Sequence, residues 1–149
     1  MIVKDTGVLK INKKVEYGLM VLRYLGEKDR NGLVSAREIC DDLKIPFDTT
    51  AKVMQALNHH NILNSVKGIK GGYSLRKDLD QISYMEMVQM IEGEIPESFC
   101  MTHKGLCGLH DSCNIVGPVE RLNLKLNEFL SNLTVQDILF GQSEIKESL

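Results

Sequence analysis

Three of the four cysteines lie close together in the C-terminal half of the chain, at Cys100, Cys107 and Cys113. In a reducing cytoplasm such a group is more typical of metal or redox chemistry than of disulfides, and thiolates are the natural ligands of iron–sulfur clusters. The paired C-x2-C spacing of a zinc ribbon is absent, which favours a cluster over zinc. Two alternatives stay open: a zinc site completed by His103 or His110, and a segment that binds no metal.

The segment that carries these cysteines, residues 93–113, contains three glycines and a proline and has little periodicity, so we expect a loop. A long helix is predicted from Gly117-Pro118 to residue 133, with proline in its first turn. Its apolar residues recur at helical spacing and need a covering surface, either within the chain or on a second copy. The fourth cysteine, Cys40, fits the apolar face of another helix and is better interpreted as a core residue.

The N-terminal half predicts a winged helix-turn-helix, and the fold class is mainly α with a small β-hairpin wing. Hydrophobic spacing indicates helices at 13–27, 36–43 and 48–60. Ser35 and Glu38 resemble a capping box for the second helix, and Asp48 is the expected N-cap of the third. Strands are expected at 62–66 and 73–75, joined by a glycine-rich tip over 67–72.

In this arrangement the third helix would enter the major groove of double-stranded DNA, and the wing would contact phosphates or the minor groove. Threonine, lysine and glutamine can contact phosphates or base edges. The candidate DNA-binding residues are Thr49, Thr50, Lys52, Gln55, Lys67 and Lys70. A plain hairpin with solvated lysines is the alternative interpretation of the wing.

The charge distribution agrees with a DNA-binding head on another kind of module. Residues 1–82 hold 14 Lys and Arg against 10 Asp and Glu, whereas residues 83–149 hold 4 against 10. Short helices are expected at 83–91 and 134–140. We therefore divide the chain into a DNA-binding domain at 9–82, a connecting helix and cysteine loop at 83–116, and a dimerisation helix with a short terminal helix at 117–141.

Several classes of protein are excluded or disfavoured by what the sequence lacks. No apolar stretch approaches the roughly 20 residues of a membrane span, and no secretory signal precedes the first helix, so we expect a cytoplasmic protein. The sequence contains no C-x-x-C, no G-x-S-x-G, no phosphate loop and no credible triad, so we do not expect an enzyme.

The ordered series of motifs resembles the IscR/NsrR-type family of iron–sulfur-binding winged helix-turn-helix transcription regulators. The resemblance covers about 9–141. It rests on Glu16-Tyr17-Gly18-Leu19, on the segment from Ile39 to Ile45, on His60-Asn61-Ile62-Leu63, on the wing signature, on the three cysteines and on the segment from Glu120 to Leu139. The most specific of these is the wing signature, Lys67-Gly68 followed by Gly71-Gly72-Tyr73-Ser74-Leu75.

The resemblance implies a homodimer, joined through the long helix, that reads a palindromic operator with two third helices about 34 Å apart. It also implies that an iron–sulfur cluster controls operator binding, with nitric oxide, redox state or cluster status as the signal. The alternative is a zinc-stabilised or metal-free repressor that senses something else.

Two departures from the family pattern concern the cluster ligands. The first gap between cysteines has six residues, where five are usual in the family. The histidine that some members carry three residues after the last cysteine is replaced by Val116. Other members use an acidic residue of the first helix, supplied by the partner subunit, and the matching residue here is Glu16. This ligand favours a 4Fe–4S over a 2Fe–2S cluster, with His103 and His110 as reserve ligands and a solvated surface glutamate as the alternative.

Overall fold

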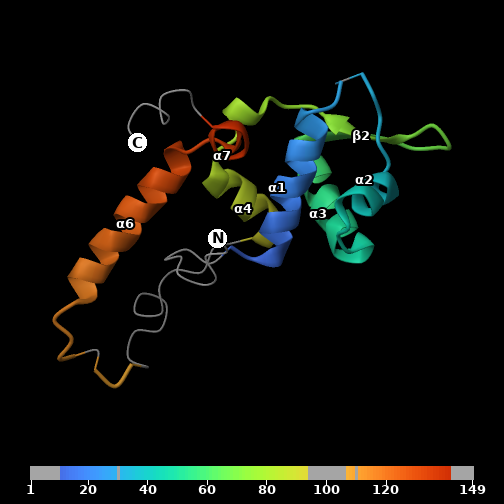
Figure 1. Ribbon diagram of the computed structural model, residues 1–149. Helices are drawn as coiled ribbons and strands as arrows, with labels where there is room; N and C mark the ends of the chain where they lie inside the picture. The colour runs from blue at the N-terminus through green and yellow to red at the C-terminus, as the bar shows by residue number, and fades with distance from the viewer. Residues whose placement is uncertain (1–10, 30, 94–106, 110, 142–149) are drawn as a thin grey trace, which may run out of the picture. The chain divides into compact units, whose positions relative to one another are not determined.

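The computed structural model describes residues 11–29, 31–93, 107–109 and 111–141, and the chain divides into two compact units, residues 1–76 and 77–149 (Figure 1). This division comes earlier than the predicted boundary at residue 82. The reason is that the segment just after Arg76 packs in the second unit, where Ile82 accepts a hydrogen bond from the amide of Val135. Each unit is described by itself below.

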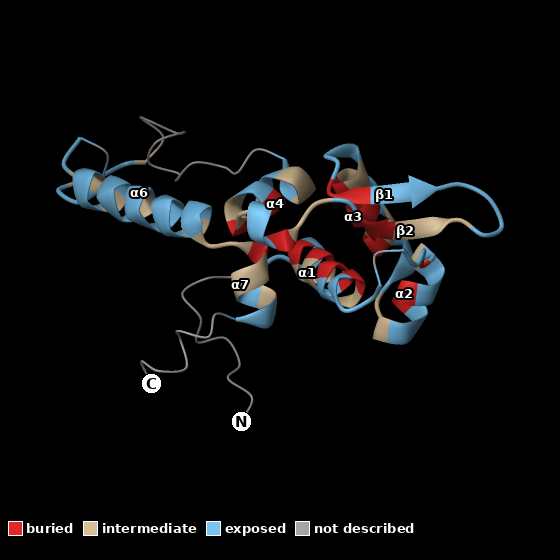
Figure 2. Cartoon of the chain, turned by 90° about the horizontal axis from the view of Figure 1, so that it is seen from above, coloured by how far each residue is buried: buried red, intermediate tan, exposed pale blue. Residues whose placement is uncertain are grey.

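Three helices form the first unit: α1 (Lys13–Gly26), α2 (Ala36–Leu43) and α3 (Phe47–His59). Side-chain caps begin the first two, since Asn12 Oδ1 accepts from the amide of Lys14 at 3.0 Å and Ser35 Oγ accepts from Glu38 at 3.1 Å. Their apolar faces meet in one core, drawn red in Figure 2. Its fully buried side chains include Val21, Leu22, Ile39, Met54 and Leu57.

Two residues with left-handed backbone lie on either side of α3. Lys44, with φ 59°, ends α2, and Asn61, with φ 63°, follows the last turn of α3. The prediction that Asp48 caps α3 is wrong, because the helix begins one residue earlier and its N-cap is Pro46. Proline suits this place, since the missing amide hydrogen would have no partner in a first turn.

The wing is an antiparallel hairpin of β1 (Leu63–Val66) and β2 (Gly72–Leu75), with Leu63 opposite Leu75 and Val66 opposite Gly72. On its other edge β2 forms a single bridge with the segment before α2. The amide of Tyr73 donates to the carbonyl of Val34 at 2.8 Å, and the amide of Val34 donates back at 3.0 Å. This bridge joins the wing to the helical part of the first unit, which is called the head below.

The second unit contains the 3₁₀ turn η1 (Leu79–Gln81) and three described helices, α4 (Tyr84–Glu92), α6 (Val116–Asn132) and α7 (Val135–Phe140). Capping boxes begin α4 at Ser83 and α7 at Thr134, and these two caps form an isolated antiparallel bridge. The amide of Tyr84 donates to the carbonyl of Leu133 at 2.7 Å. Two helix starts that are far apart in the sequence are therefore held side by side.

The predicted fold class is confirmed: the chain is mainly helical with one two-stranded hairpin. The helix expected at 83–91 is present as α4, and its buried residues are Tyr84 and Met87. Among the helices of the described residues, none has both the length and the hydropathy needed to cross a membrane.

Candidate nucleic-acid interface and cysteine segment

One face of α3 is polar and open to solvent. Lys52 and Gln55 are exposed on it, Thr49 is half-buried, and Asp48 and His59 extend the exposed row toward the two ends of the helix. Positions 48, 52, 55 and 59 follow the three- and four-residue spacing of a single helical face. A helix of 13 residues is about 20 Å long, which suits the major groove of B-DNA.

Thr50 does not lie on this face. Its side chain is fully buried, so we remove it from the residues expected to contact DNA. It lies beside Cys40 of α2, which is also buried, in agreement with the interpretation of Cys40 as a core residue. Burial raises the pKa of the Cys40 thiol, and the adjacent Thr50 hydroxyl acts in the opposite direction. A buried thiol of raised pKa is a poor nucleophile and metal ligand.

Basic residues and an absence of acids mark the wing. Lys67 and Lys70 are exposed at its tip, and Arg76 and Lys77 follow β2. From residue 60 to residue 77, all described, the sequence has no Asp or Glu. Arg76 Nη1 donates to Asn61 Oδ1 at 3.2 Å, a contact that joins the end of β2 to the end of α3. The wing therefore presents positive charge on a hairpin joined to the end of α3.

The start of α3 carries a cation–aromatic contact that the sequence does not indicate. The guanidinium of Arg37 on α2 lies 4.4 Å from the centre of the Phe47 ring. Both residues are exposed, so a positive charge lies beside the first turn of α3. These residues are ten positions apart and share no periodic pattern, and only the α2–α3 turn brings them together.

A second contact fixes α2 against α1. The hydroxyl of Tyr24 donates to Asp42 Oδ2 at 2.5 Å, and Lys28 Nζ lies 4.9 Å from the centre of the Tyr24 ring. The hydrogen bond to Asp42 raises the pKa of Tyr24 to about 12. Both contacts lie on the head, and neither is predicted by hydrophobic spacing.

Two of the three clustered cysteines lie among the described residues. Cys107 and Cys113 are both half-buried free thiols in the turns that precede α6. Thiols of this kind fit the chemistry of a thiolate-held cluster or zinc. Cys100, His103 and His110 lie outside the described residues. Within the described ranges no group of three His, Cys, Asp or Glu side chains is close enough to hold a metal ion.

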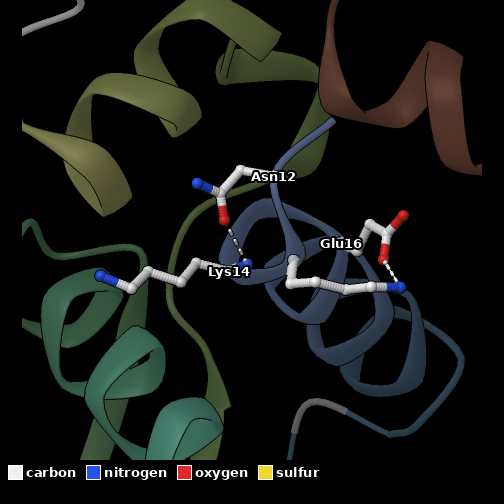
Figure 3. A network of polar contacts seen from close by, with 4 residues as sticks. Asn12, Lys14 and Glu16 are labelled. Atoms are coloured by element: carbon white, nitrogen blue, oxygen red, sulfur yellow. Dashed lines mark hydrogen bonds and ion pairs between the residues drawn. The ribbon is translucent and has the colours of Figure 1, made fainter. Parts of the chain in front are cut away.

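Glu16 lies in the first turn of α1 with its carboxylate at the surface (Figure 3). Lys13 Nζ donates to Glu16 Oε2 at 2.8 Å, and the Glu16 side chain keeps 41% of its exposure. The hydrogen bond with Glu16 raises the pKa of Lys13. The carboxylate is therefore accessible, but it already has a cationic partner on its own helix.

The long helix α6 has no buried residue among its 17, all of which the structure describes, although Val116, Val119, Asn123 and Leu130 are half-buried. The exposed fractions of Leu122, Leu124 and Phe129 are 66, 62 and 62% (pale blue in Figure 2). Apolar side chains repeated along one helix at such exposure are typical of an interaction surface.

Comparisons with known proteins agree with this fold. Residues 11–140 match the family model Rrf2, described as iron-dependent transcriptional regulator. A provisionally named HTH-type transcriptional regulator of Aquifex aeolicus (strain VF5) is 32% identical over 84% of this chain and 88% of its own length. The HTH-type transcriptional regulator NsrR of Bacillus licheniformis is 26% identical over 95% of this chain and 99% of its own. The structure of CymR, the global cysteine regulator of B. subtilis, aligns with a TM-score of 0.68 at 22% identity, covering 91% of this chain and 99% of that one.

Proposed function

Because the chain belongs to the Rrf2 family of iron-dependent transcriptional regulators, we propose that it binds a palindromic operator as a homodimer under the control of an iron–sulfur cluster. Its membership makes it a transcriptional regulator and not an enzyme. A transcriptional regulator binds chromosomal DNA, so we expect this protein in the bacterial cytoplasm. The observation that carries the cluster proposal is the pair of half-buried thiols, Cys107 and Cys113, directly before α6.

The proposed DNA surface combines the exposed face of α3 with the basic wing. Lys52 and Gln55 are placed to contact the major groove, with Thr49 beside them, and Lys67 and Lys70 are placed to contact phosphates or the minor groove. Arg37, stacked on Phe47, adds a positive charge next to the start of the helix. Each lysine lost from this surface should lower the salt dependence of DNA binding by about one phosphate contact.

The proposed cluster ligands are Cys100, Cys107 and Cys113, with Glu16 of a second subunit as the fourth. A bound cluster supplies a centre whose stability depends on redox state and on reactive small molecules. Glu16 belongs to α1 of the DNA-binding head, so a ligand bond from this residue would link the cysteine segment of one chain to the head of the other. To form it, Glu16 must exchange its hydrogen bond with Lys13 for the metal. The acidic ligand favours a 4Fe–4S cluster and nitric oxide as the signal.

Dimerisation through α6 is supported by its exposure in the single chain. Replacing Phe129 with Asp should shift the protein toward monomer, measured by sedimentation over a range of concentrations. The matched control is Ile69→Asp, since Ile69 is also an exposed aliphatic residue, at 107%, but lies on the wing. If Phe129→Asp sediments like the wild type, α6 is not the dimer interface.

The alternative is a repressor that uses zinc, or no metal, and senses another signal. The fold likeness to CymR supports this alternative, because that protein is the global cysteine regulator of B. subtilis. Purification under anaerobic conditions separates the two. A brown protein with broad visible absorbance and equal iron and sulfide supports the cluster, whereas a colourless protein with zinc or no metal supports the alternative.

Two variants test the ligands. Cys107→Ala should remove the visible absorbance while leaving circular dichroism and oligomeric state unchanged, and a full spectrum would contradict the cluster assignment. Glu16→Ala should make the cluster less stable or change its spectrum. Glu27→Ala is its control, because Glu27 follows the same helix and is likewise exposed and paired with a basic residue, Arg23. If the Glu16 and Glu27 variants behave alike, Glu16 is not a ligand.

A further inference from the structure

The tip of the wing carries an isoleucine that touches nothing. Ile69 has a relative exposure of 107%, the largest of any apolar side chain given for the described residues. Turn positions usually hold glycine, proline, asparagine, aspartate or serine, which either suit the backbone or bond to it. A β-branched apolar residue at this place contributes nothing to the core of the head.

The backbone around Ile69 is constrained. The amide of Gly71 donates to the carbonyl of Gly68 at 3.0 Å, so residues 68–71 form a closed turn with Ile69 and Lys70 at its apex. A Cβ atom on Gly71 would lie 2.0 Å from the carbonyl oxygen of Val66, so only glycine permits this turn. Glycine is also suited to Gly68, with φ 115°.

The surroundings of the apex indicate which partner it meets. Lys67 and Lys70 flank Ile69, and no acidic residue occurs between residues 60 and 77. An exposed apolar side chain enclosed by cations on a narrow hairpin does not suit an apolar protein groove, but it suits the minor groove of DNA. There lysines meet the phosphates on each side, and an aliphatic side chain can enter between base steps and partly unstack them.

We propose that Ile69 is an apolar wedge that the wing inserts into the minor groove beside the half-site read by α3. This inference rests on the proposed DNA binding and adds to it a contact of a different kind. Lysine contacts depend strongly on salt because they release counterions, whereas burial of an aliphatic side chain does not. An A·T-rich or flexible pyrimidine–purine step would be the easiest sequence for the wedge to open.

The test uses the full-length protein and a duplex selected by the wild type from a random library, with 2-aminopurine placed at successive steps flanking each half-site. Wild-type binding should raise the fluorescence at one flanking step, as unstacking requires. Ile69→Ala should weaken binding about tenfold, the order expected for one truncated aliphatic side chain, and abolish the fluorescence rise without changing the salt dependence. Ile69→Leu should retain both affinity and signal.

Two comparison variants separate this wedge from simple charge contact. Lys70→Ala should weaken binding and lower the salt slope by about one contact while keeping the fluorescence rise. Ile69→Lys should raise the salt slope and lose the rise. The proposal is overturned if Ile69→Ala binds and fluoresces like the wild type, or if its loss of affinity comes with the lower salt slope of Lys70→Ala. If the wild type selects no duplex at all, the proposed function fails, and the wedge fails with it.

Discussion

Replacing Gly71 with alanine should open the tip of the wing while the head stays folded. The new Cβ would lie 2.0 Å from the Val66 carbonyl oxygen, and real Cβ contacts are essentially never shorter than 3.0 Å, so the two strands must separate. The hydrogen bond from Gly71 to Gly68 and the pairing of Val66 with Gly72 are the interactions at risk. At about 1 kcal/mol net for each backbone hydrogen bond, the loss is about 1–2 kcal/mol.

This loss is local, because the hairpin tip can open without exposing the core. Amide hydrogen exchange should therefore show faster exchange at Gly71 in the variant, while the Tyr73 amide, bonded to Val34, keeps its protection. The affinity for a selected duplex should fall about tenfold, because an open tip no longer holds Ile69 in place. A tenfold change in the dissociation constant corresponds to about 1.4 kcal/mol. Gly108→Ala is the control for the exchange measurement, since no heavy atom lies within 4 Å of its added Cβ.

Two outcomes would contradict this reasoning. If the amide at position 71 of the alanine variant exchanges as slowly as in the wild type, the strands accommodate the methyl group without opening. Loss of protection at Tyr73 as well would show that the wing and the bridge to Val34 form one cooperative unit, so the tip cannot open alone.

Two further predictions concern stability, and a third concerns DNA contact. Thr134→Ala should lower the free energy of unfolding by about 1 kcal/mol, because it removes the capping box of α7. Ser131→Ala, at an exposed position of α6, should change this free energy little, and thermal melts compare the two variants. The hydrogen bond to Asp42 raises the pKa of Tyr24 in the folded state to about 12. The stabilisation from this bond is therefore complete below pH 10 and is lost as the pH rises to 12. Urea melts of Tyr24→Phe over this pH range should lack the decline. Thr50→Val should leave affinity for a selected duplex unchanged, since Thr50 is buried, and weaker binding would return it to the DNA surface.

Hydrophobic spacing and turn residues were sufficient to predict the head. The limits of α2, its Ser35 cap and the two strands of the wing all follow from local pattern, and the structure agrees with each within a residue or two. These features depend on interactions within a few residues of the chain, which a single sequence contains in full.

Features that depend on packing were harder to predict. Thr49 and Thr50 are adjacent and chemically identical, and only the direction in which α3 packs decides that Thr50 is buried. α3 begins at Phe47, one residue before the expected range, because Pro46 and not Asp48 is its N-cap. Its stacking with Arg37 depends on the α2–α3 turn, which has no signature in the spacing of the two residues.

The cysteine segment shows a different limit. The residue types indicate thiolate chemistry, but the structure describes only Cys107 and Cys113 of the expected ligands, and the fourth ligand would come from another chain. The ion pair between Lys13 and Glu16 is predictable from the sequence, because residues three apart on a helix are neighbours and opposite charges at this spacing pair. The exposure of α6 likewise gives the reason for a partner, although the sequence alone could not choose between internal packing and a second copy.

The bridge between Ser83 and Thr134 turns everything between them into a closed loop. Both ends are fixed by the hydrogen bonds from Tyr84 to Leu133 and from Val135 to Ile82. These bonds do not depend on the length of the chain between them. The entropic cost of closing a loop grows only with the logarithm of its length. An additional residue between Cys100 and Cys107 therefore adds little to the cost of closing the segment between α4 and α6. A segment anchored in this way allows the cysteine region to be lengthened, shortened or given other residues during evolution while the helices at its two ends stay in register.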